Sequence, residues 1–535
     1  MVPYLSCDGY KICHKNLYPP GTEFVYSNAT ARSSRVEGQN EIVVFGIQYF
    51  IQKYIIDDWN KNFFQVPIED IIYKYKRIIT NYLGEEAATV SHLEYLHSLG
   101  HLPIHIKALP EGTICPTGVP FMTFVNTDPK CFWLTNFLET ISQTVTWLPI
   151  TSATTAYRFR KMLNEWANKT SSCPEFVQWQ GHDFSMRGMS SYESCQISGA
   201  AHLLSFTGTD TIPAITFVEQ EYGADCSSEL IGGSVPATEH SIQCSYYKEN
   251  ANNENEYIDG VLNAFPAGIV SIVADGYDYW KFLSVNIANF KDRILGRNGK
   301  FVVRPDSGDP VRIVCGYTSK EVPYTAENTI AYMKASMSGY QKIWGNEDEY
   351  DCVLTSDGKY LDITGEELTE LEVKGSIQVL YEIFGGTTND KGYIELDQHI
   401  GLIYGDSITY ERANRICQLL SAKGFASTNI VFGIGSYTYQ FVTRDTYSIA
   451  FKATQVTING EVKAIFKDPK TGWHKKSAKG LLSIVKDGNS LSLINNCTPE
   501  QEEQSELKTI FKDGIQYGKL TLSEIRKNLW ANGNM

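Results

Sequence analysis

An arginine and a carboxylate two residues apart follow an apolar run near the middle of this 535-residue chain. The segment FVVRPDSGDP (301–310) places Arg304 and Asp306 where a buried strand is expected to end. Arginine can bind phosphate oxygens or a carbonyl, and aspartate can hold a sugar hydroxyl or Mg²⁺. An Arg–Asp pair that merely closes a turn explains this motif equally well. Its interpretation therefore depends on the neighbouring motifs.

Three further apolar runs stop at acidic or glycine-bearing turns. IVSIVADG ends at Asp275, IYGDS contains Gly405 and Asp406, and VFGIGS contains Gly435 and Ser436. Backbone N–H groups in such turns can surround a phosphate group. Turn geometry alone also accounts for the glycines, so each motif is weak by itself.

Other candidate side chains lie earlier in the chain. HDFSMRGMSS (182–191) offers Phe184 as a flat surface for a ring and Arg187 as a fork for phosphate. GTDTIPA places Asp210 after an apolar run, and SVPATEHS presents His240. A lone phenylalanine is more often a core residue, and a lone histidine in a turn is usually structural.

The histidines between 92 and 105 are not expected to bind a metal, because Leu99-Gly100 interrupts the helix that would align them.

The overall composition excludes several classes of protein. A formal charge of −14 disfavours non-specific binding to a nucleic-acid backbone. No apolar stretch has the length of a signal peptide core or a membrane helix. Twelve cysteines are scattered without a CxxC pair, which favours reduced thiols over zinc sites or disulfides. We expect a cytoplasmic enzyme of two domains, with no nucleic-acid or membrane partner.

Hydrophobic periodicity predicts that the two ends of the chain differ from its middle. We expect a smaller α+β domain from residues 1–165 and 440–535, and a catalytic α/β domain from 166–439 with a peripheral insertion at 316–398. In the middle, apolar runs alternate with helix-length segments, as in a parallel sheet whose carboxyl ends line one pocket. Helices are expected at 41–56, 68–82, 135–163 and 190–204, strands at 101–108, 119–126, 455–466 and 480–485, and a surface helix and tail at 499–535.

Ten motifs in order give the chain a resemblance that no single motif carries. DGYK, YPPGT, HDFSMRG, GTDTIPA, SVPATEHS, RPDSGDP, YGDS, FGIGS, TRD and FKDP follow one another from Asp8 to about Gly480. This set closely resembles the nicotinamide phosphoribosyltransferase family. The resemblance implies a type II phosphoribosyltransferase fold, which is an irregular parallel α/β barrel with a second α+β domain built from both ends of the chain. It also implies a homodimer.

The same resemblance assigns roles at the pyridine ring. Phe184 and Tyr10 of the partner subunit would sandwich the ring, and Asp210 would accept a hydrogen bond from the carboxamide nitrogen. Arg304 would contact the amide side or pyrophosphate. Nicotinate phosphoribosyltransferase is the nearest alternative, but an ionised Asp210 would repel a substrate carboxylate. A non-catalytic binding or signalling protein on this scaffold is the other alternative.

Further roles are implied around the ribose and the phosphates. Asp306 and Asp275 would lie near the ribose and hold Mg²⁺. The groups implied around the ribose and 5′-phosphate are Gly405, Asp406, Gly435 and Ser436, and the remaining phosphate and pyrophosphate contacts are Arg187 and His240 with Arg444 and Lys452 of the partner subunit. Two residues depart from the usual pattern of the family. Ser436 stands where the family often has glycine, and Ala450 stands where it often has serine.

The implied reaction is transfer of a phosphoribosyl group from 5-phosphoribosyl 1-pyrophosphate to nicotinamide in NAD salvage. The pyridine nitrogen would attack the anomeric carbon as pyrophosphate leaves, so no covalent enzyme nucleophile is needed. Asp306 and Arg304 would act directly at the reacting groups. His240 would be phosphorylated by ATP and so couple ATP hydrolysis to turnover.

Overall fold

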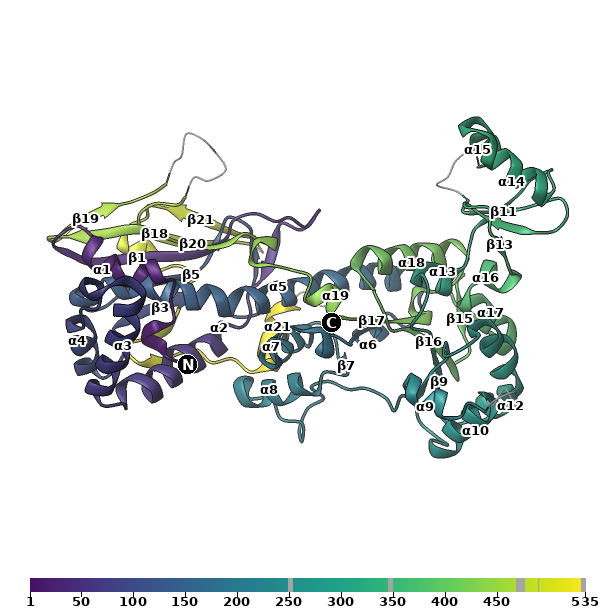
Figure 1. The fold of residues 1–535 in the computed structure, drawn as a ribbon, viewed down its shortest axis with the longest axis horizontal. Coiled ribbons are helices and arrows are strands. Elements are labelled where there is room, and N and C mark those ends of the chain that lie inside the picture. Colours follow the sequence, from purple (N-terminus) through teal and green to yellow (C-terminus); the bar gives the residue numbers. More distant parts are fainter. Residues whose placement is uncertain (249–253, 345–349, 468–476, 489, 531–535) are drawn as a thin grey trace.

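A helix of 38 residues, α5 (Trp133–Thr170), runs lengthwise through the elongated molecule and contacts both of its halves (Figure 1). The computed structural model describes residues 1–248, 254–344, 350–467, 477–488 and 490–530. Helix α5 is longer than the helix predicted at 135–163 and contains Pro149. Gly46 approaches this proline so closely that a Cβ atom on the glycine would lie 2.4 Å from the proline ring. The glycine thereby lets an N-terminal segment pack at this point of the helix.

One half of the molecule is built on a seven-stranded antiparallel sheet (Figure 1). Strand β1, next to the central strand β5, pairs with β18 over nearly its whole length, so residues near the N-terminus lie beside residues more than 400 positions later. The C-terminal strand β22 pairs with β3 in the same sheet. In spatial order the strands are β19 (Glu461–Ala464), β18 (Ile449–Ile458), β1 (Thr22–Ala31), β5 (Pro120–Asn126), β3 (Ile104–Ala108), β22 (Lys508–Lys512) and β23 (Ile515–Gln516).

Two expectations about this half are corrected by the structure. The segment predicted as a helix over 41–56 begins as strand β2 (Glu41–Val43), which pairs with β4 (Ile114–Pro116). Its helical part starts only after Gly46, whose φ of 86° breaks the chain direction, as α2 (Ile47–Tyr49) and a π-helix (Phe50–Asp57).

The final segment, expected to be a surface helix and tail, also differs. Besides β22 it contains α20 (Pro499–Glu503) and α21 (Leu522–Leu529), and α21 buries Leu522 and Ile525 in the core of this half. The other elements here are α1 (His14–Leu17), α3 (Ile68–Leu83), α4 (Ser91–Leu99), β20 (Leu482–Asp487) and β21 (Ser490–Asn495).

The other half is built on a six-stranded, entirely parallel sheet. Its strands are short and mostly buried, and all five residues of β16 are buried, as expected for a sheet covered by helices. The spatial order is β7 (Gly208–Thr209), β6 (Gly181–Asp183), β17 (Ile430–Ile434), β16 (Ile400–Tyr404), β9 (Phe301–Arg304) and β8 (Val270–Val273).

The segment 233–238 closes this sheet into a ring. Gly233 forms a parallel bridge with Gly208 of β7, and Ala237 forms one with Ser271 of β8. The segment is held at both of its ends without being a regular strand. The predicted irregular parallel α/β barrel is therefore confirmed, and we refer to residues 233–238 as the closing segment.

Helices surround the barrel and separate its strands along the chain. Helix α17 packs on the barrel core through Ile377 and Leu380, whereas α7 and α8 pack mainly against the core of the sheet half. The helices are α6 (Val177–Gln180), α7 (Tyr192–His202), α8 (Ile212–Tyr222), α9 (His240–Ser245), α10 (Glu254–Ala264), α11 (Tyr279–Lys281), α12 (Lys291–Leu295), α13 (Pro310–Cys315), α16 (Glu370–Lys374), α17 (Ser376–Phe384), α18 (Tyr410–Ala422) and α19 (Ser436–Tyr439).

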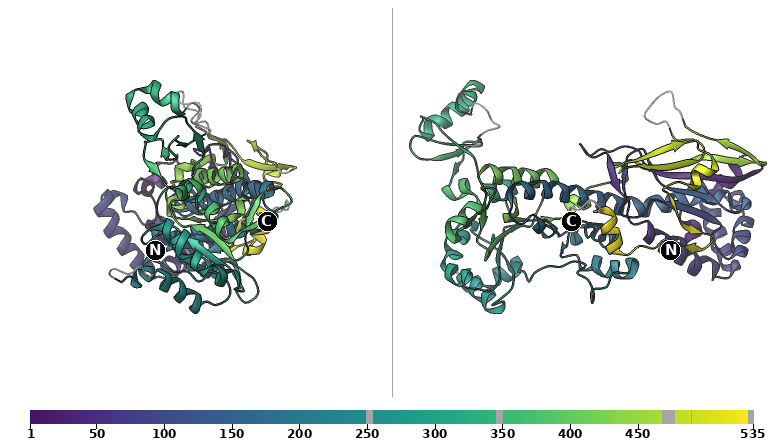
Figure 2. Two further views of the ribbon diagram at one scale, coloured as in Figure 1. Left: turned by 90° about the vertical axis from the view of Figure 1, so that its right-hand side faces the viewer. Right: turned by 180° about the vertical axis from the view of Figure 1, so that it is seen from behind.

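A small lobe projects from the barrel between β9 and α16 (Figures 1 and 2). It has a core of its own that includes Val322, Val353 and Leu361. Its elements are β10 (Ser319–Glu321), α14 (Ala326–Ala335), α15 (Met337–Trp344), β11 (Cys352–Leu354), β12 (Tyr360–Asp362) and β13 (Glu367–Leu368); the hairpin β14 (Gly386–Thr388) and β15 (Ile394–Leu396) follows α17. The elements of the projecting part, from β10 to β13, thus span residues 319–368 of the 316–398 range.

Candidate active site

The carboxyl ends of the parallel strands gather most of the predicted site residues at one rim of the barrel. Each residue follows or ends a strand: Phe184 follows β6, Asp210 β7, Asp275 β8, Gly405 and Asp406 β16, and Gly435 and Ser436 β17, while Arg304 ends β9 with Asp306 just beyond it. His240 follows the closing segment. The parallel topology explains this arrangement, because the carboxyl ends of parallel strands all lie at the same edge of the sheet.

At one end of the rim, two donors meet the carboxylate of Asp210. His182 Nε2 lies 2.9 Å from Asp210 Oδ1, and the Ser234 hydroxyl donates to the same oxygen. Burial acts to raise the pKa of Asp210, but these hydrogen bonds and the nearby positive charge hold it below its usual value. Asp210 is therefore a fixed, ionised hydrogen-bond acceptor at neutral pH.

An aromatic surface lies beside this carboxylate. The Phe184 ring is tilted by 50° to the His182 ring, with the ring centroids 4.7 Å apart. A Cβ atom on Gly433 would lie 2.6 Å from the Phe184 ring, so only glycine leaves room for the ring at this point of β17. Phe184 is half-buried, and its backbone N–H donates to the Ile434 carbonyl. This end of the site combines a flat apolar face with an acceptor.

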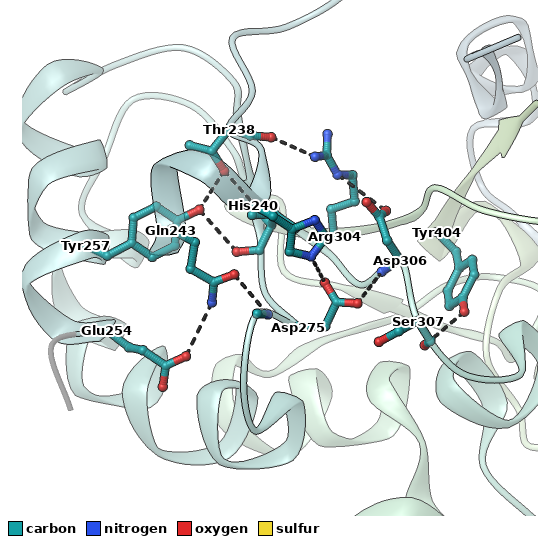
Figure 3. Close-up of polar contacts among 12 residues, drawn as sticks. Thr238, His240, Gln243, Glu254, Tyr257, Asp275, Arg304, Asp306, Ser307 and Tyr404 are labelled. Atoms are coloured by element: carbon teal, nitrogen blue, oxygen red, sulfur yellow. Dashed lines mark hydrogen bonds and ion pairs between the residues drawn. The ribbon is translucent and has the colours of Figure 1, made fainter. Parts of the chain in front are cut away.

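The other end of the rim is a network around Asp275 (Figure 3). His240 Nε2 lies 3.0 Å from Asp275 Oδ1, and the backbone N–H of Asp306 donates to Asp275 Oδ2 at 3.0 Å. Burial favours the protonated carboxyl, yet hydrogen bonds from Ser307, Asp306 and His240 together hold the pKa of Asp275 below its ordinary value. The His240 side chain is 47% exposed, whereas that of Asp275 is only 3% exposed.

Asp306 has the opposite electrostatic character. Burial raises its pKa, the charges of Asp275 and Asp406 act in the same direction, and Arg304 only partly offsets them. Its Oδ1 atom is buried, lies 3.6 Å from Arg304 Nε and makes no hydrogen bond with the described residues. A buried acceptor without a donor is costly, so this carboxylate is suited to an additional cationic or hydrogen-bonding group.

Arg304 is oriented by the closing segment. Its Nη2 donates to the Thr238 carbonyl at 2.6 Å. The Thr238 hydroxyl in turn lies 2.6 Å from the Tyr257 hydroxyl and accepts a hydrogen bond from the Val273 backbone (Figure 3). Arg304 is thereby fixed toward the rim through a strand, a helix and the closing segment.

Glycines permit two close contacts at the turns that contain Gly405 and Ser436. A Cβ atom on Gly405 would lie 2.3 Å from Asp306 Oδ1, and one on Gly188 would lie 2.0 Å from the Ser436 hydroxyl. Asp406 is exposed and accepts a hydrogen bond from Ser407. Ser436 therefore packs against the motif that contains Arg187, which is exposed on the short helix Met186–Gly188.

Three predicted residues lie elsewhere in the single chain. Tyr10 is 65% exposed on the short helix Gly9–Cys13, directly before α1, which lies in the sheet half far from the barrel strands (Figures 1 and 2). Arg444 is exposed and pairs with Asp445. Lys452 is exposed on β18, and Ala450 precedes it as a buried residue of the same strand. In the described part of the chain, none of these three side chains forms a hydrogen bond or ion pair with a rim residue.

Sequence reasoning missed several residues that shape the rim. His182 lies inside a quoted motif but has no assigned role there, and Ser234, Thr238 and Tyr257 have none either. Their partners are 19 to 66 residues away along the chain, as for Thr238 with Tyr257 and with Arg304. The only signal in the sequence is the polar composition of the segment between two apolar runs.

Metal ligands are sparse at this rim. Across the described ranges, no group of three His, Cys, Asp or Glu side chains is gathered as a metal site. The four clustered histidines do not converge, since His97 contacts the Val66 carbonyl and His105 the Thr509 hydroxyl. Asp275 and Asp306 form a pair of neighbouring carboxylates. Proteins often hold Mg²⁺ with one or two carboxylates, and substrate phosphates and water then complete its coordination shell.

In the part of the chain that the structure describes, no helix is both long and apolar enough to cross a bilayer.

The chain matches two family models and several named relatives. A model described as the nicotinate phosphoribosyltransferase (NAPRTase) family matches residues 179–515, and a model described as nicotinamide phosphoribosyltransferase, N-terminal domain, matches residues 4–106. A nicotinamide phosphoribosyltransferase of Acinetobacter baylyi is 42% identical, with 98% of this chain and 97% of the relative covered. Another from Xanthomonas campestris is 29% identical over the same fractions. A crystal structure of human nicotinic acid phosphoribosyltransferase has a TM-score of 0.48 at 13% identity, covering 98% of this chain and 93% of that one.

Proposed function

The chain belongs to the nicotinamide phosphoribosyltransferase family, and on that premise we propose that it transfers the phosphoribosyl group of 5-phosphoribosyl 1-pyrophosphate to nicotinamide. The products are nicotinamide mononucleotide and pyrophosphate, and the reaction belongs to NAD salvage. The chain is a pentosyltransferase, and its match to relatives of that name extends over nearly its full length.

The observation that carries this choice of substrate is the state of Asp210. Two donors and a lowered pKa keep it ionised beside the Phe184 ring. An ionised carboxylate accepts a hydrogen bond from a carboxamide N–H and repels a carboxylate. Nicotinamide fits this arrangement, and nicotinate does not.

The chain's own residues account for the chemical step by positioning and electrostatics. Phe184 supports the pyridine ring so that its nitrogen faces the anomeric carbon. Asp210 accepts a hydrogen bond from the carboxamide and so fixes how the ring is turned within its own plane. As the bond to pyrophosphate breaks, positive charge develops on the ribose, close to Asp306 and Asp275. Arg304 and Arg187 stabilise the negative charge of the leaving group.

We propose that Mg²⁺ binds at Asp275 and Asp306. The fit rests on the Asp306 oxygen that lacks a hydrogen-bond donor and on the oxygen-rich character of the pair. When bound, the ion neutralises pyrophosphate charge as that group departs. Arg304, 3.6 Å from Asp306, provides the permanent positive charge of the same region.

ATP is proposed as a coupling substrate that phosphorylates His240. The imidazole is accessible to solvent, and the buried Asp275 carboxylate orients it through Nε2. A carboxylate in this position stabilises a positively charged ring, which is the form that phosphoryl transfer to histidine produces. His240 serves energy coupling in this proposal, not attack on the sugar.

A homodimer with composite sites is proposed because the rim of one chain lacks the three residues of the sheet half. Tyr10, Arg444 and Lys452 would come from the partner subunit.

To test this, a chain with Arg444→Ala is mixed with a differently tagged chain that carries Asp210→Ala. Each variant alone is expected to form inactive homodimers. Random exchange places both defects in one site of a mixed dimer, so roughly a quarter of wild-type sites should return. Purified mixed dimers that stay inactive would contradict the shared site.

The reaction itself is tested by supplying the purified enzyme with 5-phosphoribosyl 1-pyrophosphate and either pyridine, with and without ATP and Mg²⁺. We expect mononucleotide and pyrophosphate in equal amounts from nicotinamide, and little product from nicotinate. Preferential use of nicotinate would overturn the proposed substrate. The twelve free thiols suit a reducing compartment, so we also propose that the enzyme works in the cytoplasm.

A further inference from the structure

Both protein donors at Asp210 bond the same carboxylate oxygen. His182 Nε2 is 2.9 Å from Oδ1, and the Ser234 hydroxyl donates to Oδ1 while lying 3.5 Å from His182 Nε2. Among the described residues, no donor forms a hydrogen bond with Oδ2. The Asp210 side chain is 43% exposed, so its second oxygen can be reached by a ligand.

The backbone around these three residues restricts their positions. His182 is the middle residue of β6, and Gly208 in β7 packs so closely that a Cβ atom there would lie 2.8 Å from His182 Nδ1. Ser234 directly follows Gly233, whose bridge to Gly208 begins the closing segment. The Asp210 backbone N–H donates to the Asp183 carbonyl at 2.9 Å. Three neighbouring segments therefore bring the two donors to one oxygen.

The hydrogen bond to Asp210 determines which nitrogen of His182 carries the proton. An ionised carboxylate only accepts hydrogen bonds, so His182 must carry its proton on Nε2 when it bonds Asp210. The same imidazole contacts the Phe184 ring, 4.7 Å away between centroids. One side chain thus braces both the acceptor and the aromatic surface of the pyridine end.

We propose that His182 and Ser234 are positioning residues that determine the choice between carboxamide and carboxylate substrates. They occupy Oδ1 of Asp210 and so present Oδ2, with its negative charge, to the substituent of the pyridine ring. A carboxamide offers this oxygen an N–H donor, whereas a carboxylate meets uncompensated repulsion. The inference rests on the proposed function, since it presumes a pyridine at this end of the site.

Without the donors, Asp210 loses its fixed rotation and part of the stabilisation of its charge. Nicotinamide then loses a well-placed acceptor, and nicotinate meets a carboxylate that can turn away or take up a proton. The two specificity constants should therefore change in opposite directions, or at least unequally. A purely structural role for His182 or Ser234 would lower both by the same factor.

The experiment compares kcat/KM for nicotinamide and nicotinate at saturating 5-phosphoribosyl 1-pyrophosphate. His182→Phe removes the donor but keeps an aromatic ring beside Phe184, and His182→Gln keeps an N–H near the position of Nε2. Hydrogen bonds to charged groups support an expected fall of about tenfold or more in the nicotinamide-to-nicotinate ratio for His182→Phe, with a smaller fall for Ser234→Ala. His182→Gln should recover most of the ratio.

Ser205→Ala is the matched control, because Ser205 is a buried serine of the same half whose hydroxyl has no hydrogen-bond partner in the described residues. Its ratio should equal that of the wild type. Equal losses for both pyridines in His182→Phe and Ser234→Ala would overturn the proposal, and so would failure of His182→Gln to restore the ratio in folded enzyme. If His182→Phe does not fold, Ser234→Ala and His182→Gln decide alone. Failure of the proposed function is distinct, because wild-type enzyme would then not prefer nicotinamide.

Discussion

Asp210 and Asp306 are carboxylates on the same rim of one barrel, yet their surroundings differ in nearly every respect. Two protein donors satisfy one oxygen of Asp210, and its pKa is lowered. Asp306 keeps a buried oxygen without a donor, and burial raises its pKa. The protein satisfies and fixes one oxygen of the first carboxylate, whereas the buried Oδ1 of the second has no protein donor and is left for a ligand.

The difference suggests a division of work between the two ends of the site. A carboxylate already fixed by the protein can discriminate between ligands, because it does not adjust to them. A carboxylate whose charge is poorly compensated gains most when a cation or a developing positive charge arrives. The proposed pyridine end of the rim is thus suited to selection between substrates, and the proposed phosphate end to catalysis.

The largest effect is expected at Asp306. Asp306→Asn should lower kcat/KM for 5-phosphoribosyl 1-pyrophosphate by about a hundredfold or more, because the proposed Mg²⁺ site and the charge proposed to lie next to the reacting sugar would be lost together. Nicotinamide binding to the free enzyme, measured by calorimetry, should change little. Asp390→Asn, an exposed change in a hairpin turn, is the control. A similar loss of nicotinamide binding would end the proposed division of work.

His240→Ala should abolish the stimulation of turnover by ATP while basal transfer persists at high substrate. The reason is that the imidazole held by Asp275 is the proposed phosphoryl acceptor and takes no part in bond formation at the sugar. ATP hydrolysis and mononucleotide formation are measured in parallel. Undiminished stimulation in this variant would remove His240 from the coupling role.

Asp210→Asn should change selection more than catalysis. The amide places its oxygen on His182 and Ser234 and presents its N–H group to the substituent, so it neither accepts from the carboxamide nor repels nicotinate, and the preference for nicotinamide should narrow by about tenfold. Competition between the two pyridines in a single reaction measures this ratio directly. An unchanged ratio would show that the substrate substituent does not face Asp210.

The smallest effect concerns stability and should have opposite signs at the two carboxylates. A raised folded-state pKa means that ionisation of Asp306 costs stability as the pH rises through it, so Asp306→Asn should gain on the order of 1 kcal/mol at pH 7. A lowered pKa gives Asp210 a stabilising contribution above about pH 4 that is lost as the pH falls through its folded value. Asp210→Asn should therefore lose less than about 1 kcal/mol, because solvent screens its half-exposed side chain.

Urea unfolding at pH 7, with Asp390→Asn as the reference, measures both changes. Destabilisation of the same size in both variants would contradict the electrostatic contrast between the carboxylates.

Four strands of the barrel, β8, β9, β16 and β17, were predictable from the sequence because they are short apolar runs that end in recognisable turns. β16 and β17 show this clearly, and their following turns hold Gly405 and Gly435 as the motifs indicate. Strand β22 escaped prediction because KTIFK buries only Phe511 fully, so its alternation is weak. Its place in the sheet is fixed by pairing with β3, and no local pattern reports such long-range pairing.

The candidate site was predictable only in part from the sequence. Residues at strand ends were identified because topology and resemblance point to the same edge. The closing segment was not, since its only pairing is a single bridge at each end and its neighbours are distant in sequence. Ser234 and Thr238 acquire their contacts only when the ring is closed. The shared roles of Tyr10, Arg444 and Lys452 remain predictions.

The order of strands in the large antiparallel sheet has a consequence for the newly made chain. Strands β1, β3 and β5 leave the ribosome early, but their outer neighbours β18 and β22 begin more than 300 residues after β5 ends. At usual translation speeds this interval lasts on the order of tens of seconds. Throughout it, both edges of a three-stranded nascent sheet have unpaired backbone groups, which is the condition that favours pairing with other chains. The barrel, whose strands all lie within that interval, can fold first, so truncation after the barrel should leave the N-terminal strands as the part that aggregates.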